Sequence, residues 1–276
     1  MKKKIIPAVL LAAFLLAAKS PAPAVWLSGF MGPENLVFDK SGTLYVTDTK
    51  HLWKVTPDKK MEQLYTLDPK QDRVSMGGLV LTPDGTIFFS GGSRILKRSP
   101  DGKISEYAKG FTFANGMAMD TTGNIYVTDS YGRKLMAVTP DGKTKVIVKG
   151  EGSLNGLRYQ AAANRLYFTS MFSGKVEYVD LKPGPAAGKP VVIVNLGFGL
   201  DDMALAPNGN LYVCQYSKGK VVKVTPNGKT EVIAEGINGP SSAAFGVRPG
   251  DTNTLYILEK GPNLRFNGTS VLVQPL

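Results

Sequence analysis

Six polar or small residues recur at one position of an internal repeat. Successive members are 43, 38, 40, 46 and 40 residues apart, and they are Glu34, Gly77, Asn115, Asn155, Asp201 and Ser241. Their carboxylates and carboxamides are hard oxygen donors, which suit Ca²⁺ and also Mg²⁺ or Mn²⁺. If these residues converge, Glu34 and Asp201 would repel each other unless a cation lay between them. The residue types therefore predict a site for a divalent cation.

The segments that carry these residues share one pattern of strands and turns. Each begins with a short apolar strand, passes through a turn containing Asp, Asn or Gly, and enters an apolar-aromatic strand, as in NGMAMDTTGNIYVTD from Asn115. A third strand, a further turn such as Pro140-Asp141-Gly142 and a fourth strand complete the unit. Asp-Gly and Asn-Gly supply the positive φ angles of tight hairpins, and the flanking Val, Ile, Tyr and Thr favour strands.

Four strands at this period predict an all-β fold, a six-bladed β-propeller with four-stranded antiparallel blades. A linear solenoid is the alternative, but it would need distinct capping repeats, and the sequence contains none. In a propeller the first strand of each blade lines the central channel. The six repeat positions would then face one end of that channel.

The two ends of the chain predict how the ring closes. The last repeat contains three strand-like runs, at residues 242–247, 254–258 and 270–273. Residues 24–27 precede the first repeat and could supply the outer strand that this blade lacks, so that no open edge remains. We therefore expect one domain, residues 25–276, in which an N-terminal strand closes the last blade.

Residues 1–24 are typical of a signal peptide. Lys2, Lys3 and Lys4 precede an apolar run at residues 7–18, and Ala22-Pro23-Ala24 is a candidate cleavage site. The run is short for a membrane span, although an uncleaved anchor is the alternative. We expect a periplasmic or secreted protein with no stable membrane span after cleavage. Cys214 is the single cysteine, so no intramolecular disulfide can form.

The formal charge of +11 raises nucleic acid as a partner. The lysines, however, recur mainly after turns, at Lys59, Lys103, Lys143 and Lys229. Outside residues 1–24 they form no dense basic run. We therefore expect a solvated basic surface and no nucleic-acid partner.

Four short motifs resemble the SMP-30/gluconolactonase/LRE-like superfamily, which also holds paraoxonase-type lactonases and strictosidine synthase-like proteins. The motifs are Gly32-Pro33-Glu34, Phe113-Ala114-Asn115-Gly116, Leu154-Asn155-Gly156-Leu157 and Asp201-Asp202-Met203. By resemblance, Glu34, Asn115, Asn155 and Asp201 would bind a divalent cation at the channel floor. In the paraoxonase branch the residue after the Asp is also a ligand, which makes Asp202 a weaker candidate.

Each candidate also has a purely structural interpretation. The Asn-Gly pairs could be turns, because Asn tolerates left-handed φ, and Asp201 could cap a turn. Glu34 could lie in an exposed loop, and Asp202, one residue along a strand, could point away from the channel. The single histidine, His51, which we expect in a surface turn, excludes the histidine pair of paraoxonase-type enzymes. Glu259 is the nearest candidate for the glutamate of strictosidine synthases, or it could pair only with Lys260.

These observations lead to a functional prediction with two alternatives. We predict a divalent-metal-dependent hydrolase of a small-molecule lactone or related ester, in which a carboxylate, Asp201 or Asp202, activates water. Ca²⁺ is the expected cation, with Mg²⁺, Mn²⁺ or Zn²⁺ as alternatives. The other readings are a non-catalytic exported binding propeller with a structural metal, and a strictosidine synthase-like protein. The sequence leaves the oligomeric state open.

Overall fold

The computed structural model describes residues 22–72, 74–150, 152–184, 186–261 and 267–276. The expected signal peptide therefore lies outside the described residues, except for residues 22–24. Among the described residues, no helix combines the length and apolar character that crossing a membrane requires.

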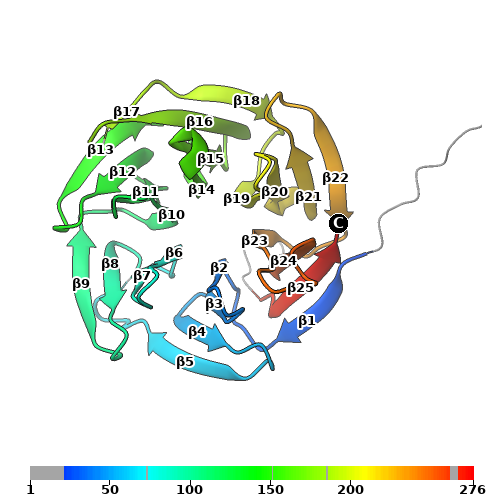
Figure 1. Cartoon of the computed structure of the whole chain (residues 1–276), viewed down its shortest axis with the longest axis horizontal. Helices are drawn as coiled ribbons and strands as arrows, with labels where there is room; N and C mark the ends of the chain where they lie inside the picture. Colours follow the sequence, from blue (N-terminus) through cyan, green and yellow to red (C-terminus); the bar gives the residue numbers. More distant parts are fainter. Residues whose placement is uncertain (1–21, 73, 151, 185, 262–266) are drawn as a thin grey trace, which may run out of the picture.

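The strands form six antiparallel sheets arranged around a common axis, which confirms the predicted six-bladed propeller (Figure 1). Blade 1 contains β2 (Asn35–Phe38), β3 (Leu44–Thr47), β4 (His51–Val55) and β5 (Met61–Thr66). Blade 2 contains β6 (Leu79–Leu81), β7 (Ile87–Ser90), β8 (Arg94–Arg98) and β9 (Ile104–Lys109). Blade 3 contains β10 (Ala114–Met119), β11 (Ile125–Asp129), β12 (Lys134–Val138) and β13 (Thr144–Lys149).

The remaining blades follow the same order from the axis outward. Blade 4 contains β14 (Leu154–Gln160), β15 (Arg165–Ser170), β16 (Lys175–Lys182) and β18 (Val191–Asn195), and the short β17 (Ala186–Ala187) also pairs with β16. Blade 5 contains β19 (Leu200–Leu205), β20 (Leu211–Gln215), β21 (Lys220–Val224) and β22 (Thr230–Glu235). Blade 6 contains β23 (Pro240–Phe245), β24 (Thr254–Glu259), β25 (Ser270–Pro275) and β1 (Ala24–Ser28). Two 3₁₀ turns, η1 (Ala161–Ala163) and η2 (Tyr216–Lys218), lie in hairpin connections.

The N-terminal strand closes the ring as predicted. β1 pairs with β25 in an antiparallel register that joins Ala24 to Val273 and Ser28 to Ser270. The ring of Trp26 packs edge-on against Tyr256 with 5.3 Å between centroids. Closure therefore removes the two edges that an open six-bladed sheet array would expose to other chains.

Apolar side chains fill the spaces between neighbouring blades. In the described part of the chain, the buried residues group into clusters that each span two adjacent blades. The cluster between blades 2 and 3, for example, joins Phe88 and Ile95 to Met117 and Val127. Because the core is divided among the blade interfaces, the axis itself is free to carry polar side chains.

Candidate functional site

The four predicted cation ligands line one cavity at one end of the axis. Glu34, Asn115, Asn155 and Asp201 all contribute to its surface, and the cavity volume is about 510 Å³. All four side chains are buried. The other two repeat positions, Gly77 and Ser241, are not among the described residues that line it. The repeat position thus brings together residues from four blades, whereas its spacing predicted all six.

β-bulges direct three of these four side chains toward the axis. The register between first and second strands shifts across residues 114–117 in blade 3, 154–157 in blade 4 and 200–203 in blade 5. Asn115, Asn155 and Asp201 each lie in the shifted stretch. A bulge leaves extra residues unpaired and bends the strand, so a side chain can turn from the blade face toward the axis. The interpretation of the two Asn-Gly pairs as turns is wrong, because both lie inside strands.

The glycines after the asparagines are required by the close approach of the next blade. A Cβ atom on Gly116 would lie 2.3 Å from the carbonyl oxygen of Asn155. A Cβ atom on Gly156 would lie 2.5 Å from Cα of Asp202. Any larger residue would push the blades apart at the axis, so Asn-Gly here is a packing signal.

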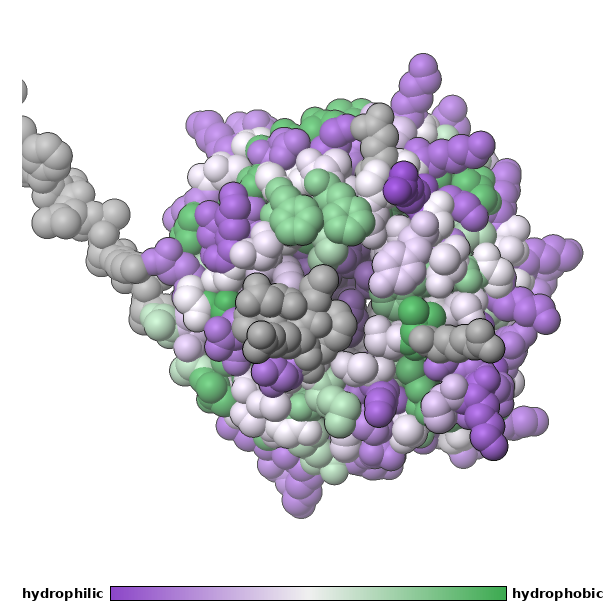
Figure 2. All heavy atoms as spheres, turned by 180° about the vertical axis from the view of Figure 1, so that it is seen from behind, coloured by the Kyte–Doolittle hydropathy of each residue, from purple (hydrophilic) through white to green (hydrophobic). Residues whose placement is uncertain are grey.

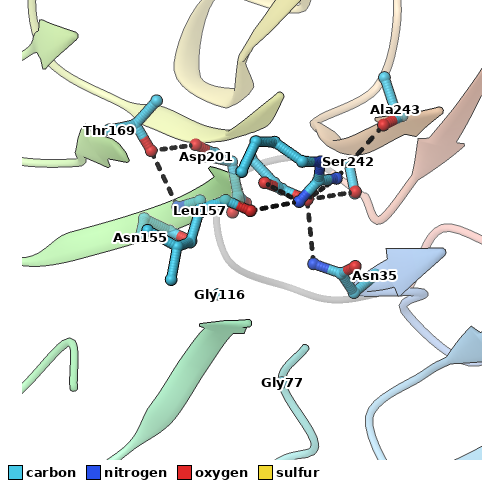
Figure 3. A network of polar contacts seen from close by, with 12 residues as sticks. Asn35, Gly77, Gly116, Asn155, Leu157, Thr169, Asp201, Ser242 and Ala243 are labelled. Atoms are coloured by element: carbon cyan, nitrogen blue, oxygen red, sulfur yellow. Dashed lines mark hydrogen bonds and ion pairs between the residues drawn. The ribbon is translucent and has the colours of Figure 1, made fainter. Parts of the chain in front are cut away.

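Threonines of the second strands hold the backbone of the site. Thr169 Oγ1 donates to the carbonyl oxygen of Asp201 at 2.5 Å, and the backbone N–H of Gly156 donates to the same hydroxyl at 2.9 Å (Figure 3). Thr128 makes the equivalent bond to the carbonyl of Asn155, and Thr47 to that of Gly77. Each threonine therefore fixes the repeat position of the following blade. This is the physical role of the Tyr-Val-Thr and Tyr-Phe-Thr runs in the repeat.

Lys260 also lines the cavity and forms a buried ion pair with Glu34. Burial lowers the pKa of the Lys260 ammonium, but the charges of Glu34 and Asp201 outweigh burial and raise it above its usual value. Burial also raises the pKa of the Asp201 carboxyl well above its usual range, and Glu34 adds to this, while Lys260 acts against it. The floor therefore contains two acidic side chains, Glu34 and Asp201, and the basic side chain of Lys260. Sequence reasoning missed Lys260 as a site residue because its residue type is not repeated. Its position is repeated, since Ser130, Met171 and Tyr216 follow β11, β15 and β20 in the same way and also line the cavity.

The oxygen donors at the floor fit a hard divalent cation. Asn155 Oδ1 is buried and has no hydrogen-bond partner among the described residues, whereas buried polar atoms are almost always paired. Among the described residues, no group of three or more His, Cys, Asp or Glu side chains is arranged so that it could hold a metal ion. The set is instead two carboxylates and two carboxamides, and Ca²⁺ accepts amide oxygens as well as carboxylates. Glu34 could join such a set only after giving up part of its contact with Lys260.

Asp202 belongs to a different environment from Asp201. Its carboxylate accepts two bonds from the Arg158 guanidinium, at 3.0 and 2.6 Å, one from Asn35 at 3.0 Å and one from Ser242 at 2.6 Å. Figure 3 shows Asn35 and Ser242 approaching this network from neighbouring strands. Asp202 is not among the described residues that line the cavity. Its carboxylate is therefore saturated with protein donors, and this geometry does not support the predicted catalytic role.

Two further residues take structural positions. His51 begins β4, not the expected turn, and its Nδ1 lies 3.0 Å from the buried carboxylate of Asp48. Glu259 accepts a hydrogen bond from the backbone N–H of Asn238 at 3.0 Å. Lys260 pairs with Glu34, which is the partner that the sequence did not indicate.

Comparisons with known proteins agree with this architecture. The chain matches the sequence model of the SMP-30/Gluconolactonase/LRE-like region over residues 32–260. A search of curated proteins finds no significant match.

Solved structures share the fold at low sequence identity. A luciferin-regenerating enzyme is 18% identical with a TM-score of 0.77, and the match covers 93% of this chain and 96% of that one. A calcium-binding protein, regucalcin from Agrobacterium tumefaciens, is 14% identical with a TM-score of 0.76, over 94% and 96% of the two chains. A gluconolactonase from Xanthomonas campestris is 17% identical with a TM-score of 0.74, over 95% and 92%. The family match over most of the chain, together with the converging Glu34, Asn115, Asn155 and Asp201, shows that the chain belongs to the SMP-30/gluconolactonase/LRE-like family.

Proposed function

We propose that this protein hydrolyses a small-molecule lactone or related ester at the cavity floor, with a divalent cation, most simply Ca²⁺, held by Glu34, Asn115, Asn155 and Asp201. The observation that carries the proposal is the convergence of these four oxygen donors, with Asn155 Oδ1 buried and unpaired among the described residues. When bound there, the cation would polarise the substrate carbonyl and stabilise the negative charge that develops on its oxygen.

The protein's own residues prepare the floor for this chemistry. The side chain of Asn155 lies beside the Asp201 carboxyl and acts to lower its pKa, against the effect of burial. Thr169 holds the backbone carbonyl of Asp201, so the side chain starts from a fixed position. Asp201 is therefore the carboxylate best placed to accept a proton from an attacking water. Asp202 is left out of this role because Arg158, Asn35 and Ser242 already occupy its oxygens.

Lys260 supports a second candidate function. Its ammonium already supplies positive charge beside Glu34 and Asp201. A floor neutralised in this way could serve a binding propeller that carries out no reaction. The two functions differ in one measurable respect, since only the hydrolase turns over substrate.

The test is a hydrolysis assay on metal-depleted protein. The protein is treated with a chelator, and a lactone panel is followed by pH-stat with and without added Ca²⁺, Mg²⁺, Mn²⁺ or Zn²⁺. We expect turnover that depends on the cation and is lost in Asn155→Leu, which keeps the side-chain size but removes the oxygen donor. The matched control is Asn253→Leu, an exposed change in the turn between β23 and β24. No hydrolysis above background with any cation would overturn the proposal and favour the binding propeller.

A further inference from the structure

The mouth of the cavity is aromatic, in contrast to its polar floor. Phe113, Tyr131, Phe172 and Phe198 line it, and they come from the entrance to blade 3, the β11–β12 turn, the β15–β16 turn and the entrance to blade 5. Tyr131 is 61% exposed, and Phe172 and Phe198 are each 58% exposed. Figure 2 shows hydrophobic rings standing next to each other on a face with many hydrophilic side chains. Such exposure of large apolar rings is costly in water and marks binding surfaces.

Phe172 and Phe198 form a flat stacked pair. Their ring centroids are 6.0 Å apart and their planes differ by 13°. Beside them, Phe113 and Tyr131 pack with centroids 5.3 Å apart. The two pairs present ring surface to the same cavity that holds the oxygen donors.

The backbone around Phe198 is built to present this ring. Gly197 and Gly199, on either side of it, have φ angles of +83° and +90°, which side-chain-bearing residues rarely adopt. A Cβ atom on Gly199 would lie 2.0 Å from Ser217 Oγ. Ser217 Oγ donates to the carbonyl oxygen of Phe198 at 2.7 Å. The ring is therefore held outward by its backbone.

A further hydrogen bond ties the two phenylalanine loops together. The backbone N–H of Gly199 donates to the carbonyl oxygen of Met171, next to Phe172, at 2.7 Å. The stacked pair is thus preorganised, which lowers the entropic cost of binding a rigid partner against it.

The charge distribution in the cavity further restricts the chemical class of the ligand. Among the described residues that line the cavity, the charged ones are Glu34, Asp201 and Lys260, and all three lie at the floor. Two of the hydroxyls that line the cavity are already used, since Ser130 donates to the carbonyl of Leu154 and Ser217 to that of Phe198. The mouth therefore suits a neutral, flat, apolar group better than a charged or polyhydroxylated one.

We propose that the substrate carries an aryl substituent that lies against Phe172 and Phe198 while its carbonyl faces the floor. The inference rests on the proposed function for the identity of the reacting group, but the aromatic recognition can be tested without catalysis. Ring stacking on this pair would add affinity beyond simple area burial.

The binding test uses lactams, whose amide resists hydrolysis. Affinities for γ-phenyl-γ-butyrolactam and unsubstituted γ-butyrolactam are measured by calorimetry or ligand-observed NMR. We expect the phenyl compound to bind about tenfold or more tightly, equivalent to ~1.4 kcal/mol. The preference should shrink in Phe198→Ala, nearly vanish in the Phe172→Ala/Phe198→Ala double variant, and survive in Val232→Ala, an exposed apolar change on the outer strand β22.

A second measurement separates failure of this inference from failure of the proposed function. The ratio of kcat/KM for γ-phenyl-γ-butyrolactone over γ-butyrolactone is determined for the same variants. Phenyl preference in lactam binding without any hydrolysis would support aromatic recognition while refuting the hydrolase. Hydrolysis with equal kcat/KM for both lactones, or a phenyl preference unchanged in the double variant, would overturn the aryl-substrate inference.

Discussion

Asp201 and Asp202 are neighbours in one bulge of β19, yet they occupy opposite kinds of environment. Asp202 accepts four hydrogen bonds from three side chains, including both arms of Arg158. Asp201 faces a cavity beside Glu34, and burial raises the pKa of its carboxyl. A buried charge is stable when its partners satisfy it and reactive when they do not. The bulge therefore separates a carboxylate that bonds to neighbouring blades from one that faces the cavity.

We expect the largest effect from a substitution that breaks the hydrogen-bond network around Asp202. Asp202→Ala leaves the Arg158 guanidinium without its carboxylate and also deprives Asn35 and Ser242 of an acceptor. Removing one partner of a buried ion pair typically destabilises by 3–5 kcal/mol, and we expect about 3 kcal/mol. Urea denaturation measures this loss. A loss below about 1 kcal/mol would mean that the network is not structural.

Asp201→Asn should have the reverse profile. The substitution removes the acid beside Glu34 but keeps the size of the side chain. We expect the melting temperature to stay the same or rise, while cation-dependent lactone hydrolysis falls about 100-fold, or ~2.7 kcal/mol. Calorimetric titration with Ca²⁺ and thermal unfolding check the two halves. A large loss of stability together with unchanged cation affinity would reverse the roles assigned to the two aspartates.

Lys260→Met tests the cavity side of the comparison, where Glu34 and Asp201 lie. The ammonium neutralises Glu34 in the ion pair, so its removal should let Glu34 bind a cation fully. We expect Ca²⁺ to bind about tenfold more tightly, because a competing positive charge is gone, and the cation-free protein to be less stable. Calorimetry on the variant measures both, with the exposed Lys182→Met as control. Equal Ca²⁺ affinity in the variant and the wild type would show that Lys260 does not compete.

Asp120, in the turn between β10 and β11, should give the smallest effect. Its carboxylate is held by hydrogen bonds without the deep burial of Asp201 and Asp202. Burial raises the pKa of its carboxyl, but hydrogen bonds from Asn124, Thr122 and Tyr126 outweigh burial and hold the pKa below its ordinary value. A depressed pKa in the folded state contributes stability that is complete above the unfolded value near 3.8 and is lost as the pH falls through the folded value. Asp120→Asn should therefore lower the melting temperature slightly at pH 7 and less at pH 3. An equal decrease at both pH values would contradict this linkage.

Much of the site could be predicted from the sequence because a propeller repeats. The period places equivalent residues at equivalent depths around one axis, so Glu34, Asn115, Asn155 and Asp201 could be aligned without coordinates. Closure of blade 6 by β1 could also be predicted from the sequence, because the last repeat lacks an outer strand of its own.

The part of the site that the sequence did not reveal depends on contacts that are not repeated from blade to blade. Lys260 follows β24 and reaches Glu34 only because blade 6 and blade 1 are neighbours in the closed ring.

The sequence by itself determined the fold class, the closure and the alignment of the residues that line the cavity floor, because these follow from strand periodicity. Only the tertiary structure decided which of two adjacent aspartates faces the cavity, since that depends on a bulge and on Arg158 from another blade. It also decided that Phe172 and Phe198, 26 positions apart in the chain, stack at the mouth, because a hydrogen bond between their loops brings them together. Local patterns specify strands and residue types, whereas side-chain direction and charge pairing arise where the blades meet.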